Sequence, residues 1–371
     1  MKKHLVFILA SLIVFVVVMV YLWCENHKPI ITKELVTIQA NGACPTNNRQ
    51  YQASVWLGVY DGKLYFYPHC GTVLDRTSYD GFLCVFENGG ATKLTDLKKG
   101  KHSVSIQGFL APFLYYWDKD PDADEQSDSL YCCDLQSRAE RQLCSGEAQL
   151  TQNSFFSEDG AAYFPLRAEN EKTPQFVCVK DGTFSRVAPL TEGYPLNGRT
   201  YYAVAEYSDT VERLLCEDEN GVVTEVPLGF AHRRSVIPCG NGLLIHNESG
   251  PNILYWINEE GEVRELFSVE CLDSTSAVAI HGTDVYLSFM RYKEYGDIGM
   301  KRYENDAWEG TYRISLADFS SKKISNKIYD GLYVFDDECI YACDEECSIV
   351  QMNFDGEIIR TLFSRTNESA N

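Results

Sequence analysis

Residues 340–362, IYACDEECSIVQMNFDGEIIRTL, contain three short apolar stretches separated by polar turn residues. Ile340 and Tyr341 end the first stretch, residues 349–354 form the second, and Asp355-Gly356 leads into a third at residues 359–362. An Asp-Gly pair favours the positive backbone φ angles of a tight hairpin turn. The segment therefore predicts consecutive antiparallel strands, the pattern of one small β-sheet unit.

The same unit recurs along the chain, marked by an apolar strand that ends in a bulky, usually tyrosine-bearing pair. The pairs are Leu64-Tyr65, Leu114-Tyr115, Ala162-Tyr163, Tyr201-Tyr202, Leu244-Ile245, Val285-Tyr286 and Ile340-Tyr341. Their spacings are 50, 48, 39, 43, 41 and 55 residues, an average of about 46, which is typical of propeller blades. The turns after them are Asn88-Gly89, Gln136-Ser137, Asp181-Gly182, Asn220-Gly221, Glu260-Gly261, Phe319-Ser320 and Asp355-Gly356.

The repeat predicts an all-β fold, a seven-bladed β-propeller. Strands such as KLYFY (63–67) and ILYWI (253–257) are more continuously apolar than a one-sided sheet requires, as expected where both faces pack on neighbouring blades. Without the first 28 residues about 343 of the 371 remain, which divides into seven units of about 49. Six or eight blades stay open as alternatives, because residues 35–40 (LVTIQA) could be an extra closing strand.

The N-terminal segment predicts one transmembrane helix. Residues 5–23 are uncharged and mostly apolar, Lys2 and Lys3 precede them, and Glu25 follows. Nineteen residues nearly match the ~30 Å hydrocarbon core, and the flanking charges place the N-terminus in the cytoplasm. The alternatives are a cleaved signal peptide, for which no A-x-A-like site follows, and a lipid anchor at Cys24, for which Trp23 is too bulky.

These boundaries predict five regions. Residues 1–4 are a cytoplasmic stub, 5–23 the anchor, 24–50 a linker with the possible closing strand, 51–365 the propeller and 366–371 a polar tail. The expected location is the cell membrane, with the C-terminal domain extracytoplasmic. A net charge of −20 repels phosphate backbones, so nucleic acid is not an expected partner.

A resemblance follows from these repeats. Residues 340–362, and Leu254-Tyr255-Trp256-Ile257 with the segment 261–266, resemble bacterial propellers similar to the low-density-lipoprotein-receptor YWTD type, although Ile257-Asn258 departs from the Thr-Asp of that signature. Ser157-Glu-Asp-Gly160 before AAYF is similar to a TolB-like repeat. The resemblance covers residues 50–365, with two blades matching well. It implies a propeller fold and a binding role rather than a reaction.

The fourteen cysteines would suggest disulfides in an extracytoplasmic protein. Cys84, Cys133, Cys178 and Cys216 fall, however, at equivalent positions of successive repeats, which stand beyond the ~7 Å limit for bridging. They are expected to be small buried apolar residues. In the run Cys339, Cys343 and Cys347, a structural role is favoured, and a local Cys343–Cys347 bridge or a metal site are the alternatives.

Two insertions carry candidate binding residues. The longer, residues 290–312, contains Tyr292, Tyr295, Tyr303 and Trp308 among basic side chains, a composition typical of recognition loops. An ordinary long hairpin is the alternative. The acidic segment from Asp118 to Asp124 could bind Ca²⁺, although a solvated acidic loop is the simpler interpretation.

The sequence predicts a binding protein rather than an enzyme. Motifs of the types G-x-S-x-G, H-E-x-x-H, C-x-x-C and the P-loop are absent from the chain, so we expect no catalytic residues, bound metal or cofactor. The expected partner is a protein or a cell-envelope polymer. The alternatives are a glycan- or peptide-processing enzyme with a site at the channel mouth, and a subunit of an envelope assembly or transporter.

Overall fold

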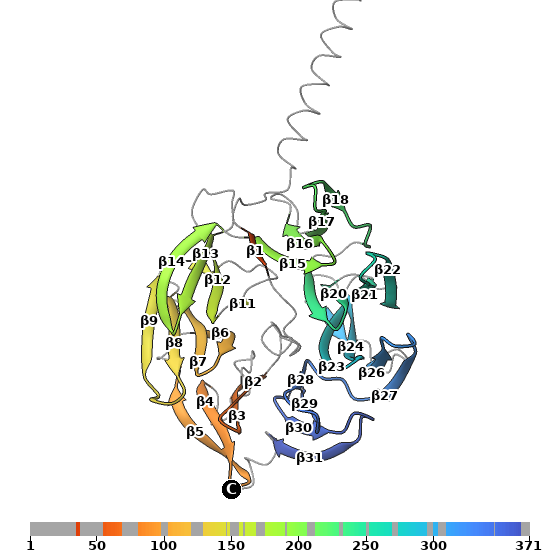
Figure 1. Ribbon diagram of the computed structural model, residues 1–371. Coiled ribbons are helices and arrows are strands. Elements are labelled where there is room, and N and C mark those ends of the chain that lie inside the picture. Colours follow the sequence, from red (N-terminus) through yellow and green to blue (C-terminus); the bar gives the residue numbers. More distant parts are fainter. Residues whose placement is uncertain are drawn as a thin grey trace, which may run out of the picture.

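The computed structural model describes residues 35–37, 55–68, 81–97, 103–119, 129–145, 147–148, 156–158, 160–167, 175–189, 191–205, 212–229, 233–249, 252–268, 274–294, 300–302, 309–344 and 346–364. In these residues the chain forms seven antiparallel sheets, which are arranged in a ring in the order of the sequence (Figure 1). The predicted seven-bladed β-propeller is therefore confirmed. No helix of the described residues is long and apolar enough to cross a membrane. The predicted anchor at 5–23 lies outside them.

Each blade has four main strands, numbered here from the centre of the ring outward. Blade 1 consists of β2 (Val55–Tyr60), β3 (Lys63–Pro68), β4 (Phe82–Glu87) and β5 (Gly90–Asp96). Blade 2 consists of β6 (Ser103–Leu110), β7 (Phe113–Lys119), β8 (Ser129–Asp134) and β9 (Glu140–Ser145). In blade 3 the first strand is divided into β10 (Glu147–Ala148) and β11 (Phe156–Glu158), which both pair with β12 (Ala161–Arg167). Blade 3 ends with β13 (Gln175–Lys180) and β14 (Thr183–Pro189).

Blades 4 to 7 repeat this order. Blade 4 consists of β15 (Thr191–Leu196), β16 (Arg199–Ala205), β17 (Glu212–Glu217) and β18 (Val223–Glu225). Blade 5 consists of β19 (Arg233–Cys239), β20 (Gly242–Ser249), β21 (Asn252–Ile257) and β22 (Val263–Ser268). Blade 6 consists of β23 (Ser274–His281), β24 (Asp284–Glu294), β26 (Gly310–Ser315) and β27 (Ser321–Ser325), with β25 (Met300–Arg302) paired to the end of β24. Blade 7 consists of β28 (Gly331–Val334), β29 (Ile340–Cys343), β30 (Ile349–Met352) and β31 (Ile358–Phe363).

The recurring pairs of the sequence lie at the start of the second strand of each blade, and not at the end of a strand as the sequence predicts. Leu64-Tyr65, for example, follows the first residue of β3. The repeat pattern did not predict the innermost strand of each blade, which comes before these pairs in the sequence. It is an edge strand, which tolerates proline, and Pro195 in β15 and Pro238 in β19 interrupt its apolar pattern.

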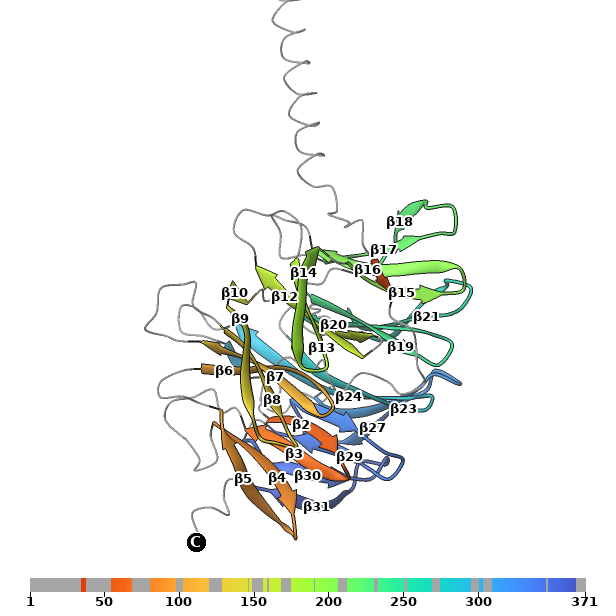
Figure 2. The same cartoon turned by 60° about the vertical axis from the view of Figure 1, so that its left-hand side comes forward.

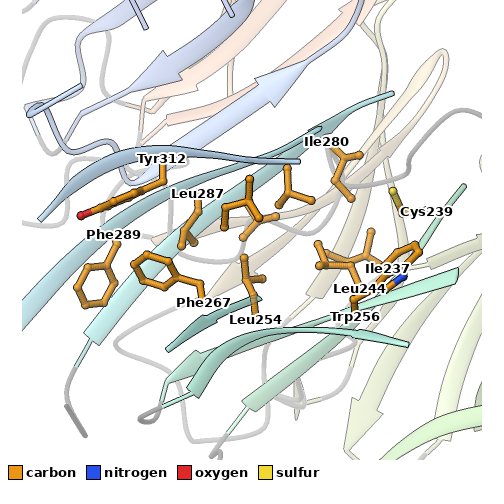
Figure 3. Packing of buried hydrophobic residues seen from close by; sticks show 13 residues of the cluster. Ile237, Cys239, Leu244, Leu254, Trp256, Phe267, Ile280, Leu287, Phe289 and Tyr312 are labelled. Carbon is orange, nitrogen blue, oxygen red and sulfur yellow. The ribbon is translucent and has the colours of Figure 1, made fainter. Parts of the chain in front are cut away.

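The core lies between blades, as the two-sided apolar strands predict. In β3, Tyr65 and Tyr67 pack with residues of blade 2, whereas Leu64 and Phe66 on the other face pack with residues of blade 7. One of these interfaces joins blades 5 and 6 (Figure 3), where Leu254, Trp256 and Phe267 meet residues such as Leu287 and Tyr312. Because apolar burial is shared between neighbours, each blade stabilises the next.

The ring closes without exchanging a strand between the chain ends. Blade 1 is built from β2 to β5 and blade 7 from β28 to β31, so each is continuous in sequence. Phe66 and Phe363 have ring centroids 5.3 Å apart across this junction. The buried Tyr333 hydroxyl donates a hydrogen bond to the Val55 carbonyl at 2.9 Å. Side-chain packing and the Tyr333–Val55 hydrogen bond therefore join blades 7 and 1.

Part of the predicted closing segment, residues 35–40, does form a strand, but this strand lies in blade 4 and not at the junction between blades 7 and 1. β1 (Leu35–Thr37) pairs in parallel with Thr191–Gly193 of β15 and becomes a fifth strand on the inner edge of blade 4. The ladder between β15 and β16 begins only at Tyr194. The first half of β15 therefore takes its described strand partner from β1, which joins the propeller rather than the linker.

Candidate functional site: the long-connection rim

The two rims of the propeller differ because antiparallel strands send alternate connections to opposite ends. Links from strand 1 to 2 and from strand 3 to 4 share one end, which we call the turn rim. Links from strand 2 to 3 and between blades share the other, the long-connection rim. At the turn rim, connections of only two residues join consecutive strands at 61–62, 88–89, 181–182 and 197–198. At the long-connection rim, 13 residues separate β3 from β4 and 15 separate β24 from β26.

The turns of the turn rim follow the local chemistry of the sequence. Asn88 and Gly89 have φ angles of 53° and 81°, and Asp181 and Gly182 have 51° and 64°, as the predicted Asn-Gly and Asp-Gly turns require. Such tight turns leave little chain for shaping a binding surface. Long connections on a rigid scaffold are where binding residues concentrate, so the long-connection rim is the candidate site.

Of the four predicted recognition residues, the structure describes the backbone of one. Tyr292 lies in β24, opposite Arg302 of β25. The insertion thus continues the second strand of blade 6 as a two-stranded ribbon, residues 292–294 with 300–302, which we call the blade 6 ribbon (Figure 2). Tyr295, Tyr303 and Trp308 lie outside the described residues. The described part of the predicted insertion is thus a β-hairpin, and its recognition role stays a prediction.

Buried polar side chains lie at the same rim in blade 5. Arg234 and Asn247 are opposite each other on the two inner strands and are 3% and 1% exposed. The Arg234 guanidinium donates a hydrogen bond to the carbonyl of Gly229, whose own amide donates to the Tyr255 hydroxyl at 3.1 Å. Gly229 belongs to the connection from blade 4 to blade 5, so these contacts fix the start of blade 5.

The neighbouring pair, Ser235 and His246, is also buried. Burial lowers the pKa of His246 from 6.5 to about 4, because an apolar environment disfavours the charged imidazolium. His246 is therefore neutral at physiological pH. A neutral, buried imidazole on the inner strands acts as a structural residue.

Blade 6 holds its connection to blade 7 in a similar way. Ser288 and Thr311 are opposite each other on β24 and β26. The amide of Tyr329 donates to the Ser288 hydroxyl at 2.7 Å, and the Thr311 hydroxyl donates to the Lys327 carbonyl at 2.9 Å. Buried backbone groups need such partners. The polar residues of this rim therefore act as clamps that give the long connections rigid starting points.

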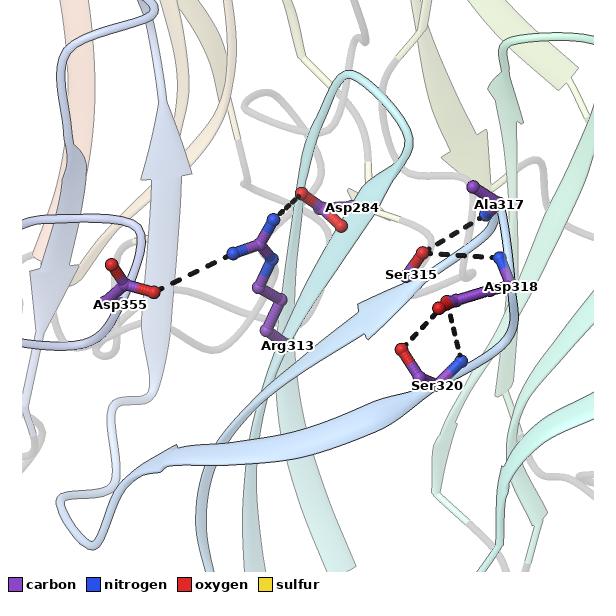
Figure 4. A network of polar contacts seen from close by, with 7 residues as sticks. All are labelled: Asp284, Arg313, Ser315, Ala317, Asp318, Ser320 and Asp355. Carbon is purple, nitrogen blue, oxygen red and sulfur yellow. Dashed lines mark hydrogen bonds and ion pairs between the residues drawn. The ribbon is translucent and has the colours of Figure 1, made fainter.

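The turn rim carries a different polar network, which sequence reasoning missed. Arg313 of blade 6 donates to Asp284 at 2.7 Å and lies 3.8 Å from Asp355 of blade 7 (Figure 4). The hydrogen bond to Asp284 raises the pKa of Arg313. These residues are 29 and 42 positions apart in the sequence, and no local pattern links them. Exposed ion pairs contribute little stability, so this network aligns turns rather than forming a site.

A second contact crosses the same two blades. The His281 ring stacks on Phe354 with centroids 4.1 Å apart, and its Nε2 lies 2.9 Å from Asp337 Oδ1. Asp337 itself is 99% exposed. The contact joins the turns of blades 6 and 7 next to the Arg313 network. Its signal in the sequence, a single histidine before a Gly-Thr turn, is too weak to predict it.

The cysteines behave as apolar core residues. Cys84, Cys133, Cys178 and Cys216 lie in the third strands of blades 1 to 4, as predicted. The ten described cysteines are thiols, so a Cys343–Cys347 bridge is not formed. Burial raises the pKa of Cys132 to about 11 and that of Cys133 to about 12.

The spacing of Cys339, Cys343 and Cys347 has a structural explanation. Cys343 ends β29, and Cys347 lies in the following turn at a φ of 62°. The Asp344 carboxylate accepts hydrogen bonds from the amides of Glu346 and Ser348 and fixes that turn. Among the residues that the structure describes, no group of His, Cys, Asp or Glu side chains could hold a metal ion. Asp118 is buried at the end of β7, and the rest of the suspected calcium segment lies outside the described residues apart from the backbone of Lys119.

Comparison with protein-family models and with curated proteins finds no match. Among solved structures, 322 chains match, and one of them is described as a crystal structure of puromycin hydrolase. It is 10% identical, with a TM-score of 0.46, and the match covers 87% of this chain and 62% of that one. This chain thus spans less than two thirds of that protein, and a similarity of this level carries no argument about activity. The resemblance to YWTD-like and TolB-like repeats stays a prediction.

Proposed function

We propose that this chain is a membrane-anchored, extracytoplasmic binding module that recognises a protein partner or a cell-envelope polymer. The observation that supports the proposal most is the asymmetry of the rims. The turn rim is built from tight turns, whereas the longest connections leave the long-connection rim, where one of them continues as the blade 6 ribbon.

The physical basis is a rigid scaffold with long connections. Buried clamps such as Arg234–Gly229 and Ser288–Tyr329 hold the blade-to-blade connections in place. Binding then costs less conformational entropy than it would if those segments had to be ordered first. Tyr292, Tyr295, Tyr303 and Trp308 are the proposed contact residues, because aromatic side chains supply large contact area with few rotatable bonds.

The anchor at residues 5–23 and the extracytoplasmic location remain part of the proposal. They rest on the uncharged apolar segment and on the charges that flank it. The net charge of −20 favours partners that are neutral or basic where they face the body of the propeller.

Site-specific photocrosslinking of the full chain in its native membrane tests the proposal. A benzophenone amino acid would replace Tyr295 or Trp308 in the insertion, and Phe184 as a control. Phe184 is 40% exposed and follows the 181–182 turn at the turn rim. We expect a discrete adduct from positions 295 and 308 that is absent from position 184. The same adducts from all three positions, or from none, would contradict recognition by this rim.

Alanine at Tyr295 and Trp308 should also abolish partner capture while the melting temperature stays unchanged. Release of fragments from envelope glycans or peptides by the purified chain would instead support an enzyme. That result would replace the binding proposal.

A further inference from the structure

The direction of β1 shows from which rim the N-terminal segment enters the propeller. β15 runs from the long-connection rim to the turn at 197–198. β1 is parallel to β15, and Leu35 is the partner of Thr191, the first residue of β15. The N-terminal end of β1, at Leu35, therefore lies at the long-connection rim.

This direction determines which rim faces the membrane, given the anchor of the proposed function on which this inference rests. Eleven residues, 24–34, lie between Trp23, the end of the anchor, and Leu35. Fully extended, they span about 40 Å. Reaching a membrane on the side of the turn rim would require the tether to use more than half of this length, about 24 Å for a seven-residue strand, in passing back along a blade. The direct path therefore places the long-connection rim on the membrane side.

The blade 6 ribbon leaves the propeller at that same rim and is basic. Its six residues include Lys293, Lys301 and Arg302 against one acid, Glu294, in a chain of net charge −20. The 295–299 tip that joins the two strands adds a single acid, Asp297. Local charge here is thus opposite in sign to that of the whole protein.

The register of the ribbon places like charges at opposite positions. Lys293 is the direct partner of Lys301. Like charges at directly opposite positions destabilise an antiparallel pair.

We propose that the blade 6 ribbon binds the phosphate groups of anionic phospholipids in the membrane that anchors the chain. The ribbon and the membrane-facing direction of β1 are independent observations that point to the same surface. The body of the propeller, being strongly acidic, is repelled by an anionic bilayer. The basic ribbon provides local attraction and holds one side of the rim at the headgroups, which orients the remaining long connections over the membrane.

Hydrogen exchange of the full chain in lipid nanodiscs tests this proposal. One set of discs contains only phosphatidylcholine, and the other contains phosphatidylglycerol at about one third of the lipid. We expect amides of residues 291–302 to exchange at least fivefold more slowly in the anionic discs. The protection should disappear in 0.5 M NaCl, because the Debye length then falls to about 4 Å.

Two charge-reversal variants separate the ribbon from general charge. In Lys293→Glu/Lys301→Glu the protection should be lost. The matched control, Lys180→Glu/Lys322→Glu, changes the net charge equally at two exposed positions next to turn-rim turns and should keep it. Equal exchange in both kinds of disc, or protection that survives the ribbon substitutions, would overturn the proposal.

Two further experiments test which anion binds the ribbon and whether residues 5–23 anchor the chain. Soluble polyphosphate added to phosphatidylcholine discs should not replace the lipid effect. If polyphosphate protects the ribbon and phosphatidylglycerol does not, the membrane is the wrong occupant and the proposal fails. Release of the chain from membranes by alkaline extraction would refute the anchor alone. Flotation of the released chain with anionic vesicles would then test whether the blade 6 ribbon binds lipid. Binding that depends on Lys293 would support the proposal, and no such binding would contradict it.

Discussion

Replacing Tyr333 by Phe should weaken the closure of the ring between blades 7 and 1. Tyr333 is 1% exposed on β28, and its hydroxyl donates to the Val55 carbonyl 2.9 Å away. Burial raises the pKa of this hydroxyl well above 10, so it keeps its proton and remains a donor. Within the described residues, this hydroxyl is the donor that reaches the Val55 carbonyl across the junction between blades 7 and 1.

The magnitude follows from the loss of one partner of a buried pair. Tyr333→Phe keeps the ring and its packing but leaves a buried carbonyl without its donor, which costs about 1–3 kcal/mol. This corresponds to an increase of about fivefold to a hundredfold in the opening of the junction. Since no strand is exchanged between the chain ends, we expect the opening to be local to blades 7 and 1.

Native-state hydrogen exchange measures this opening segment by segment. Amides of β2 and β28 should exchange faster in the variant, while those of blades 3 to 5 stay unchanged. Tyr202→Phe is the matched control, because the Tyr202 hydroxyl makes only a 3.5 Å contact with Glu217 inside blade 4. Unchanged exchange in β2 and β28, or equal effects of the two variants, would refute the idea that this hydrogen bond closes the ring.

Three other predictions follow from the described contacts. The pKa of His246 is about 4 in the folded protein and 6.5 in the unfolded chain. As the pH falls, the unfolded state therefore binds a proton first, and about 3 kcal/mol of folding stability should be lost between pH 6.5 and 4. Urea unfolding across this range measures the loss, and His246→Gln should flatten it. Cys132 and Cys133, buried thiols with raised pKa values, should resist iodoacetamide at pH 8 until urea is added; mass spectrometry of the labelled peptides would expose early reaction. A Val36→Cys/Glu192→Cys variant should form the disulfide that the β1–β15 register allows, and its absence under oxidation would contradict the parallel pairing.

The sequence was sufficient for the architecture because that information is local. Alternating and continuous apolar stretches report strands within about six residues, and Asn88-Gly89 or Asp181-Gly182 report turns within two. Repetition of these short patterns about every 46 residues implied a propeller. The positions of Cys84 and its equivalents in the third strands of blades 1 to 4 followed from the same register. Where the local pattern was weak, as in the innermost strands with Pro195 and Pro238, the sequence missed a strand.

Tertiary structure decided everything that joins distant residues. Leu35 and Thr191 are 156 positions apart, and Val55 and Tyr333 are 278 apart, and neither contact leaves a periodic trace in the sequence. The same is true of the clamps at Gly229 and Tyr329, which serve connections rather than strands. Which rim carries the long connections, how the ring closes and where the N-terminal strand docks depend on closing the chain in space. Apolar periodicity can specify which face of a strand is buried, but not which distant partner buries it.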